Sequence, residues 1–476
     1  MCDLPELALS EICAIPLPDG AAVDQALEKA FLSFHKKVVV LDDDPTGTQT
    51  VHHVPVYTDW SLETLEQIMG DTEPVAFILT NSRSFSKDRT IQVHKEIAAN
   101  LAAAAKKYDQ EFLLISRGDS TLRGHYPLET QVLKETFEEE TALSFDGEIF
   151  CPYFGDGGRY TVNNIHYVCE GEKLIPAGQT EFAKDRSFGY KASDLREYIE
   201  EKSDGMIPAS QCVAISLQEL RQCDYDGITK KLMDCNNFQK VIVNAAHDMD
   251  LKVFMTCWIR AMAHGKNYLA RSAASLTRIA GHVSLAPLLT RQQLRREDGP
   301  GGLVIIGSHV QKTTRQLKCL MESKMPLCFL EFHADSVLGE DGLKAEADRI
   351  LNLAREAVLS KKTAVIYTSR RVIVPDSENK DQILELSVRI SQALTGIVSR
   401  FGICPAFIIA KGGITSSDVA TRGLGIKKAM VMGQVKKGIP VWLTGGEAVF
   451  PNMPYIIFPG NVGNEETLRE IVELLL

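Results

Sequence analysis

The sequence predicts a two-domain α/β protein in which each domain has a mainly parallel sheet flanked by helices. Three observations support this fold class. Buried-type apolar runs alternate with helix-like stretches, the alternation occurs in two series, and a charged, glycine-rich segment separates the two series. The length of 476 residues suits two to four domains of ordinary size.

The first series contains six β-rich runs of the kind found in parallel strands that are buried on both faces. These runs lie at 37–44, 75–82, 112–120, 148–154, 212–217 and 240–246. Between the second and third runs, residues 87–107 place apolar side chains at spacings of three and four, which predicts a helix.

The second series repeats the pattern after residue 300. Its runs lie at 302–308, 327–332, 363–369, 406–413, 441–446 and 455–461. Between the two series, the segment RQQLRREDGPGG (291–302) combines a charged helix end with Gly-Pro-Gly-Gly, which is typical of a linker. We therefore predict one domain at 1–297 and a second at 298–476.

Composition narrows the class of protein. There are 62 acidic and 52 basic side chains, giving a formal net charge of −10, which argues against nucleic acid as the main partner. No apolar run approaches the length needed to span a bilayer, and the N-terminus does not resemble a signal peptide. The 11 scattered cysteines form no C-x-x-C pair and predict reduced, mostly buried thiols. We expect a cytoplasmic enzyme that does not act on membranes.

Three acidic residues end the first β-rich run, in Asp42-Asp43-Asp44-Pro45-Thr46-Gly47. Consecutive carboxylates repel one another, and the end of a buried strand increases the repulsion, so a cation, a substrate hydroxyl or a basic side chain should neutralise part of the charge. The alternative is a solvated acidic turn built around Asp44-Pro45.

Two further polar clusters follow β-rich runs of the first series. One is Thr80-Asn81-Ser82-Arg83-Ser84, and the other runs from Ser116 to His125 and contains Asp119, Ser120 and Arg123. Arginine forks suit a carboxylate, and an aspartate suits hydroxyl groups, so this mixture fits a polyhydroxylated acid. A loop with an internal Asp–Arg pair is the alternative for the second cluster.

A fourth stretch, from Pro152 to Tyr160, contains G-x-G-G but lacks the third spaced glycine of a dinucleotide fingerprint. A turn that closes over a pocket explains it at least as well. His166, which follows, is more typical of a structural histidine than of a catalytic base.

Three glycine-containing turns follow β-rich runs of the second series. They are Gly307-Ser308-His309, Lys411-Gly412-Gly413-Ile414-Thr415 with a helix expected from about 417, and the stretch from Pro459 to Asn464. Glycines let the backbone approach phosphates, and a helix N-terminus attracts anions. Since no G-x-x-x-x-G-K-[ST] motif occurs, the turns predict a nucleotide site built from backbone amides; ordinary strand-to-helix turns are the alternative.

Taken together, these segments resemble the four-carbon acid sugar kinase family, also known as DUF1537, from about residue 37 to 470. Eight motifs in matching order carry the resemblance: DDDPTG (42–47), TNSRS (80–84), GDSTLRG (118–124), GRYTVNNIHYV (158–168), TEFAKDRSFGY (180–190), GSHVQKT (307–313), AKGGITSSDVATRGL (410–424) and FPGNVG (458–463).

The resemblance implies an N-terminal domain that binds a sugar acid and a C-terminal domain that binds ATP, with both ligands at the carboxyl ends of strands in a cleft between the domains. It implies ATP-dependent phosphorylation of a hydroxyl of threonate, erythronate, 3-oxo-tetronate or a similar acid. By similarity, the substrate residues are Asp43, Asp44, Arg83, Asp119, Ser120 and Arg123. The nucleotide residues are Ser308, Gly412, Gly413, Ile414, Thr415 and Gly460, with Gly463 next to them.

The expected mechanism needs a base near the acceptor hydroxyl and charge neutralisation around the phosphates. Asp43, Asp44 or Asp119 would take the proton, and the others would hold hydroxyls or water-bound Mg²⁺. Arg83 and Arg123 would hold the substrate carboxylate. The sequence identifies no direct metal ligand. It also does not determine the oligomeric state, and a homo-oligomer is one option.

Two other classes of function remain open on these residues. One is a lyase or isomerase that acts on sugar acids without a nucleotide, and the other is a non-catalytic regulator that binds the same ligands. ATP-induced thermal stabilisation separates the lyase from the kinase, and ADP release separates the regulator.

Overall fold

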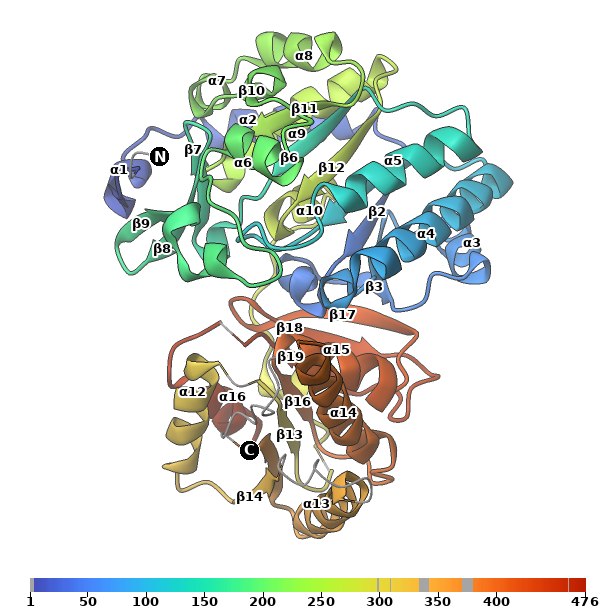
Figure 1. Cartoon of the computed structure of the whole chain (residues 1–476), viewed down its shortest axis with the longest axis vertical. Coiled ribbons are helices and arrows are strands. Elements are labelled where there is room, and N and C mark those ends of the chain that lie inside the picture. Colours follow the sequence, from blue (N-terminus) through green and yellow to red (C-terminus); the bar gives the residue numbers. More distant parts are fainter. Residues whose placement is uncertain (1–3, 298, 309, 334–341, 370–379, 461) are drawn as a thin grey trace. The chain divides into compact units, whose positions relative to one another are not determined.

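The computed structural model describes residues 4–297, 299–308, 310–333, 342–369, 380–460 and 462–476, with no side chains described between 380 and 388. The chain forms two compact units. Unit 1 comprises Met1–Asp43 and Asp59–Ser284, and unit 2 comprises Asp44–Thr58 and Leu285–Leu476. Each unit is a sheet flanked by helices, so the predicted two-domain α/β class is confirmed (Figure 1). The predicted boundary at 297/298 stays a prediction, and residue 298 lies outside the described residues.

The main sheet of unit 1 is entirely parallel. Its strands, in spatial order, are β10 (Val213–Ile215), β11 (Gln239–Val243), β6 (Gly147–Cys151), β12 (Tyr268–Ser272), β5 (Phe112–Arg117), β2 (Lys37–Asp42) and β4 (Val75–Leu79). Six of these strands fall in the predicted runs; β12 was not predicted. Every residue of β2 is buried, as expected for a strand covered on both faces.

Helices cover this sheet in two groups. In one group α3 (Leu62–Gly70) packs on α4 (Lys87–Tyr108), which packs on α5 (Leu128–Glu140); in the other, α2 (Gly20–Phe31), α8 (Tyr225–Asp234) and α10 (Ala274–Ala280) surround α9 (Asp248–Ala263) (Figure 1). The helix predicted at 87–107 is confirmed as α4. It begins after Ser86, whose hydroxyl accepts a hydrogen bond from the Arg89 amide, and ends at Asp109 in the left-handed region. The shorter helices of unit 1 are α1 (Leu9–Cys13), α6 (Leu195–Lys202) and α7 (Leu217–Arg221).

A small antiparallel sheet is added to unit 1 by the segment after β6 together with an N-terminal strand. Its strands, in order, are β1 (Leu7–Ala8), β9 (Lys173–Pro176), β8 (Ile165–Glu170) and β7 (Arg159–Val162). The G-x-G-G stretch is the tight turn that enters β7: Gly155–Gly157 form a single 3₁₀ turn, and Gly158 has a φ of +74°.

Unit 2 contains a mixed sheet. Its strands, in order, are β3 (Val54–Tyr57), β17 (Lys428–Lys436), β18 (Ile439–Thr444), β19 (Pro454–Phe458), β16 (Ile408–Lys411), β13 (Leu303–Ile306), β15 (Thr363–Thr368) and β14 (Leu327–Phe332). The last five are mutually parallel. The expectation that 441–446 continues the parallel pattern is wrong, because β18 leaves β17 through the two-residue turn Lys437-Gly438 and so runs antiparallel to both neighbours.

The helices of unit 2 are α11 (Arg291–Leu294), α12 (Gln311–Met321), α13 (Gly342–Leu359), α14 (Lys380–Ser399), α15 (Gly413–Asp418) and α16 (Thr467–Leu475). Helix α12 packs against α16, and α13 packs against α14. Helix α15 begins at Gly413, four residues before the predicted start at 417, because the turn after β16 contains only Gly412.

Residues 44–58 belong to unit 2 although they follow β2 of unit 1 directly in the chain. They form a 3₁₀ helix, Pro45–Thr50, and strand β3, which pairs antiparallel with β17. The indole N–H of the buried Trp442 on β18 donates a hydrogen bond of 2.9 Å to the hydroxyl of Thr48. The sequence patterns did not predict this exchange, because it depends on pairing between segments 370 residues apart.

No helix in the described ranges is long and apolar enough to cross a membrane. Ten cysteines fall within these ranges, and only Cys151, Cys235 and Cys257 are buried. The expectation of mostly buried thiols is therefore wrong, since most of the cysteines lie outside the apolar strands.

We expect Thr48→Val to lower the free energy of unfolding by about 1–3 kcal/mol, because valine has a similar shape but leaves the buried Trp442 N–H without its acceptor. Urea denaturation followed by tryptophan fluorescence measures the change. Thr72→Val, at an exposed threonine, is the control and should change the value by less than about 0.5 kcal/mol. Equal effects of the two substitutions would contradict the importance of this contact.

Candidate functional site

The site in unit 1 is built along the carboxyl ends of three adjacent strands. Asp42 at the end of β2 is paired in register with Arg117 at the end of β5, and Arg117 is paired with Ser272 at the end of β12. Because the carboxyl ends of parallel strands lie at the same edge of a sheet, these three side chains and the loops after them lie together at that edge.

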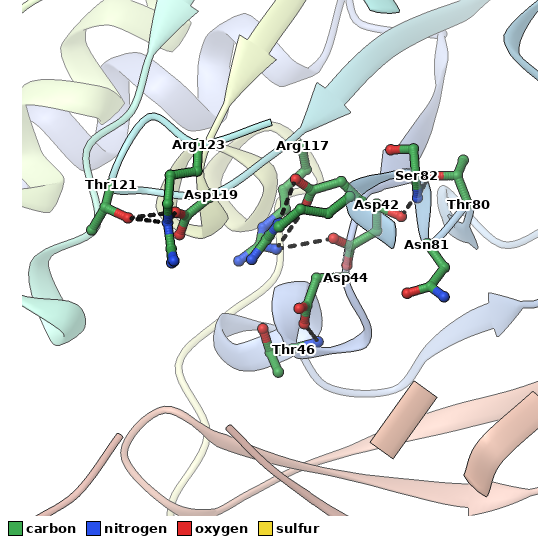
Figure 2. Close-up of polar contacts among 12 residues, drawn as sticks. Asp42, Asp44, Thr46, Thr80, Asn81, Ser82, Arg117, Asp119, Thr121 and Arg123 are labelled. Carbon is green, nitrogen blue, oxygen red and sulfur yellow. Dashed lines mark hydrogen bonds and ion pairs between the residues drawn. The ribbon is translucent and has the colours of Figure 1, made fainter. Parts of the chain in front are cut away.

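Two arginines hold the first acidic cluster. The Nη1 atom of Arg117 lies 3.0 Å from Asp42 Oδ1 and 3.5 Å from Asp43 Oδ1. Arg83 donates two hydrogen bonds to the Asp43 carboxylate, of 2.6 Å from Nη2 and 3.1 Å from Nε. Figure 2 shows the contact between Arg117 and Asp42 at the strand ends. Asp42 and Asp43 are both buried, so the expected neutralisation by a basic side chain is present, and a solvated acidic turn is excluded for these two residues.

Asp119, in the loop after β5, forms a second cluster. It accepts hydrogen bonds from the hydroxyl of Thr121 and, at 2.7 Å, from Arg123 Nε (Figure 2). Burial raises the pKa of Asp119, but the charges of Arg123 and Arg83 and these two hydrogen bonds outweigh burial and hold the pKa well below its ordinary value. Asp119 is therefore a stable anion and a strong hydrogen-bond acceptor. Its neighbour Ser120 is also buried.

Arg159 is a further cation beside this cluster. Its guanidinium and that of Arg123 lie over the Phe182 ring, with centroid distances of 5.8 and 5.1 Å. Its Nη1 donates a hydrogen bond to the Gly157 carbonyl, whereas its buried Nε has no hydrogen-bond partner among the described residues. Burial lowers its pKa, while the nearby Asp119 raises it. Arg159 is half-buried beside Asp119, and its guanidinium charge is suited to an anionic ligand. Sequence reasoning quoted Arg159 in a motif but gave it no role.

His166 has a structural role. Its Nε2 lies 2.8 Å from the Ser120 carbonyl oxygen, and its Nδ1 lies 2.9 Å from the Thr161 hydroxyl. Burial lowers the pKa of His166 to about 4, so the ring is neutral at physiological pH. The ring fixes the loop that carries Asp119 and Ser120, which agrees with the structural role favoured from sequence.

Arg271 and Ser272, at the end of β12, complete the cluster and were missed from sequence. Arg271 Nη1 donates to Ser116 at 3.0 Å and to the buried Glu129 at 2.7 Å. The signal was present in YLARSAAS (268–275), a short apolar run followed by polar residues, like the three runs that were recognised. Its brevity hid it, since YLA alone does not distinguish a strand from a helix.

In unit 2 the three glycine turns lie together, because they follow the adjacent parallel strands β13, β16 and β19. Ile306, Lys411 and Phe458 are register partners at the ends of these strands. A Cβ at Gly412 would lie 2.9 Å from the Ser308 Cβ, and one at Gly460 would lie 3.2 Å from the Ser308 Oγ. The turns are thus close enough to face one small ligand with backbone amides and hydroxyls.

The remaining predicted nucleotide residues surround this cluster. The Thr415 hydroxyl lies where a side chain at Gly307 would fall, and Ile414 is 63% exposed beside it. Gly463 has a φ of +81° and packs against Thr467. His309 and Asn461, which belong to two of the quoted turns, lie outside the described residues.

Asp44 lies beside the turn after β16, within unit 2. A Cβ at Gly413 would be 2.9 Å from Asp44 Oδ2, and Asp44 Oδ1 accepts a hydrogen bond of 2.8 Å from the Thr46 amide. Asp43 and Asp44 therefore belong to different units, although they are consecutive.

Lys411 is buried between two of the turns. Its ammonium donates a hydrogen bond of 3.0 Å to the Pro459 carbonyl and lies 3.6 Å from the centroid of the Phe458 ring. Burial, with a smaller contribution from Lys312, lowers the pKa of Lys411 to about 7. Lys411 thus links the turn after β16 to the turn after β19.

Oxygen donors of the kind that Mg²⁺ prefers lie beside the turn after β16. Among the described residues no group of three or more His, Cys, Asp or Glu side chains could hold a metal ion alone. Mg²⁺ usually takes one or two protein oxygens together with phosphates and water. The Ser308 and Thr415 hydroxyls and the Asp44 carboxylate are oxygen donors of the required kind.

We expect Lys411→Met to change the pH dependence of stability. The folded pKa of about 7 lies below the ordinary 10.5, so the unfolded state binds more protons between these values, and burial of the lysine costs less as pH rises from 7 to 10. The stability of the variant relative to wild type should therefore be highest at pH 6–7 and should fall by up to about 1.4 kcal/mol per pH unit above pH 7. Urea unfolding of both proteins from pH 6 to 10 measures this difference; a difference independent of pH would contradict the prediction.

Comparisons with known proteins match a domain family to each of the two parts of the chain. The sequence model of a sugar-binding N-terminal domain matches residues 38–279, and that of a nucleotide-binding C-terminal domain matches residues 303–468. No curated protein matches the sequence.

Three solved structures match the chain, and the first two are similar to it in fold. A Salmonella typhimurium LT2 protein described as a "putative tRNA synthase" has 14% identity and a TM-score of 0.64, over 91% of this chain and 98% of that one. A Haemophilus influenzae DUF1537 protein has 14% identity and a TM-score of 0.58, over 92% and 100%. A Bordetella bronchiseptica DUF1537 protein, a domain-swapped dimer with bound citrate, has 17% identity and a TM-score of 0.38, over 92% and 98%.

The two domain matches occur in the order of the two units and leave only 23 residues (280–302) between them. The chain belongs to the four-carbon acid sugar kinase family, also known as DUF1537.

Proposed function

We propose that the protein uses ATP to phosphorylate a hydroxyl of a four-carbon sugar acid such as threonate, erythronate or 3-oxo-tetronate. One observation carries the proposal: the consecutive residues Asp43 and Asp44 belong, respectively, to the arginine–carboxylate cluster of the sugar-binding unit and to the glycine turn of the nucleotide-binding unit. A single peptide bond therefore links a group suited to the acceptor with a group suited to the phosphate donor.

The cluster of unit 1 has the charges that a sugar acid requires. Asp119 accepts hydrogen bonds from substrate hydroxyls, and the buried Ser120 supports the same loop. Arg83 and Arg123 bind the substrate carboxylate through their guanidinium groups, and Arg159 adds positive charge. Arginine suits this role because its charge persists at all physiological pH values.

The turns of unit 2 bind the ATP phosphates. Ser308, Gly412, Gly413, Thr415 and Gly460 present backbone amides and hydroxyls, and Gly463 shapes the end of the last turn. The exposed aliphatic side chains of Val310 (49%) and Ile414 (63%) flank these turns and offer apolar surface to the nucleotide base. Mg²⁺ would neutralise phosphate charge, with the Ser308 and Thr415 hydroxyls as its oxygen donors.

Asp44 is the base in this proposal. Asp44 lies beside the phosphate-binding turn, where its negative charge and that of the phosphate repel one another. A hydroxyl group between them removes part of this repulsion, because its proton forms a hydrogen bond to the carboxylate, and the acceptor hydroxyl of the substrate is such a group. Asp119 is a poor proton acceptor because its pKa is held well below the ordinary value. Asp43 is bound by Arg83 and Arg117, which suits the positioning of substrate.

ATP-induced thermal stabilisation and ADP release also test the two alternative functions, a lyase or isomerase and a non-catalytic regulator. A lyase or isomerase without a nucleotide would gain no thermal stability from ATP, and the match to a nucleotide-binding domain argues against it. A regulator would bind both ligands and release no ADP.

We expect Asp44→Asn to reduce kcat by about 10²–10⁴-fold, because it removes the proton acceptor, and to leave ATP-induced thermal stabilisation in place. Asp119→Asn should act mainly by raising KM for the acid. Coupled ADP-release assays against threonate, erythronate and their oxo forms measure both effects. The control is Asp226→Asn, at a fully exposed aspartate, which should behave as wild type. Near wild-type kcat for Asp44→Asn would refute the base assignment.

We expect Gly412→Ala to abolish the stabilisation by Mg-ATP, because an alanine at a φ of +119° is strained and its Cβ would meet Ser308 at 2.9 Å. Differential scanning fluorimetry with and without Mg-ATP measures the loss. Gly446→Ala is the matched control in the same unit, since a Cβ there meets nothing within 4 Å. If Gly412→Ala kept the full ATP shift, the glycine turns would not be the nucleotide site.

A further inference from the structure

A small pocket opens beside Asp119 in unit 1. Its polar lining consists of Asp119, Arg271 and Ser272, and its apolar lining includes Phe150 and Tyr198. A carboxylate, a guanidinium and a hydroxyl that converge between aromatic walls form an arrangement typical of sites that orient small polar ligands.

The Ser272 hydroxyl is the unusual member of this lining. Ser272 is 4% exposed, and among the described residues its Oγ has no hydrogen-bond partner. The backbone is fully engaged, because the Ser272 carbonyl accepts a hydrogen bond of 2.9 Å from the Gly118 amide and β12 is paired on both sides. A buried hydroxyl without a partner is costly, so a ligand group that pairs with it would remove a penalty already present in the folded protein.

Arg271 is held in position before any ligand arrives. Ser116 and Glu129 bind its Nη1, and Glu129 is held in turn by the Ser82 hydroxyl at 2.5 Å. Gly118 leaves room for the guanidinium, because a Cβ there would lie 2.1 Å from Arg271 Nη2. The guanidinium therefore presents a fixed face to the pocket.

We propose that this pocket, defined by Asp119, Arg271 and Ser272 and with room of about 10 Å³, binds one hydroxyl group of the sugar acid and selects its configuration. Ser272 pairs with one hydroxyl and Asp119 accepts a hydrogen bond from its neighbour. The inference rests on the proposed function for the class of ligand. Asp119 lies in the loop after β5 and Ser272 ends β12, so the two groups reach the ligand from different elements, and inverting one of the two hydroxyl-bearing carbons would move its hydroxyl away from its partner.

The experiment measures coupling between Ser272 and one substrate hydroxyl. Isothermal titration calorimetry on the full chain gives Kd for the threonate and erythronate stereoisomers, for 3,4-dihydroxybutanoate and for 2,4-dihydroxybutanoate. Ser272→Ala should weaken binding of the preferred four-carbon acid by about 10- to 100-fold, and should leave unchanged the analogue that lacks the partner hydroxyl. Ser323→Ala, which removes another unpartnered hydroxyl in unit 2, is the matched control and should bind all ligands as wild type does.

Folding of the variants is measured alongside. Ser272→Ala removes a hydroxyl that makes no hydrogen bond within the described protein, so its Tm should equal or exceed that of wild type. Ser272→Cys, which is nearly isosteric and a weak donor, is the second variant and should show the same selective loss.

Three results would overturn the proposal. Ser272→Ala could bind every acid as wild type does, meaning that the pocket holds only water; it could lose affinity equally for all the acids; or wild type could bind none of them. Failure of the kinase function is distinguishable: the acids would bind with the Ser272-dependent pattern, but ADP release would be absent.

Discussion

The site of unit 1 depends on the ion pairs of Arg117 with Asp42 and Asp43. Asp42 and Asp43 follow a strand that is buried along its whole length, and two carboxylates there would be unstable without a cation. Arg117 lies beside these carboxylates because β2 and β5 are parallel neighbours in a register that pairs Asp42 with Arg117. That register also brings the loop after β5, with Asp119, and the end of β12, with Ser272, to the same edge.

The same principle operates in unit 2 with different chemistry. Three parallel strands end at Ile306, Lys411 and Phe458, and the turns that follow contribute glycines and hydroxyls instead of paired charges. Lys411 is the buried basic side chain of this edge, and among the described residues it bonds to a backbone carbonyl and not to a carboxylate. Its positive charge is therefore only partly stabilised, which accounts for its lowered pKa.

The assignment of residues 44–58 to unit 2 divides the acidic motif between the two units. The 3₁₀ helix Pro45–Thr50 and strand β3 are fixed there by Trp442 and by pairing with β17. Asp44 is thereby held beside Gly413, while its neighbour Asp43 stays with Arg83. The boundary between the two units thus falls within the motif of three consecutive aspartates, at the peptide bond between Asp43 and Asp44.

The sequence by itself determined the fold class, the strand series and most of the polar clusters, because apolar periodicity and the residues that end parallel strands are local signals. It also led to the family, since eight motifs occur in the expected order. Only the tertiary structure decided that Asp44 belongs to unit 2, that β18 is antiparallel, and that Arg271 and Ser272 join the cluster of Asp119. Each of these depends on pairing between segments distant in the chain, and such pairing is set by sheet register and burial, which no local pattern of residues contains.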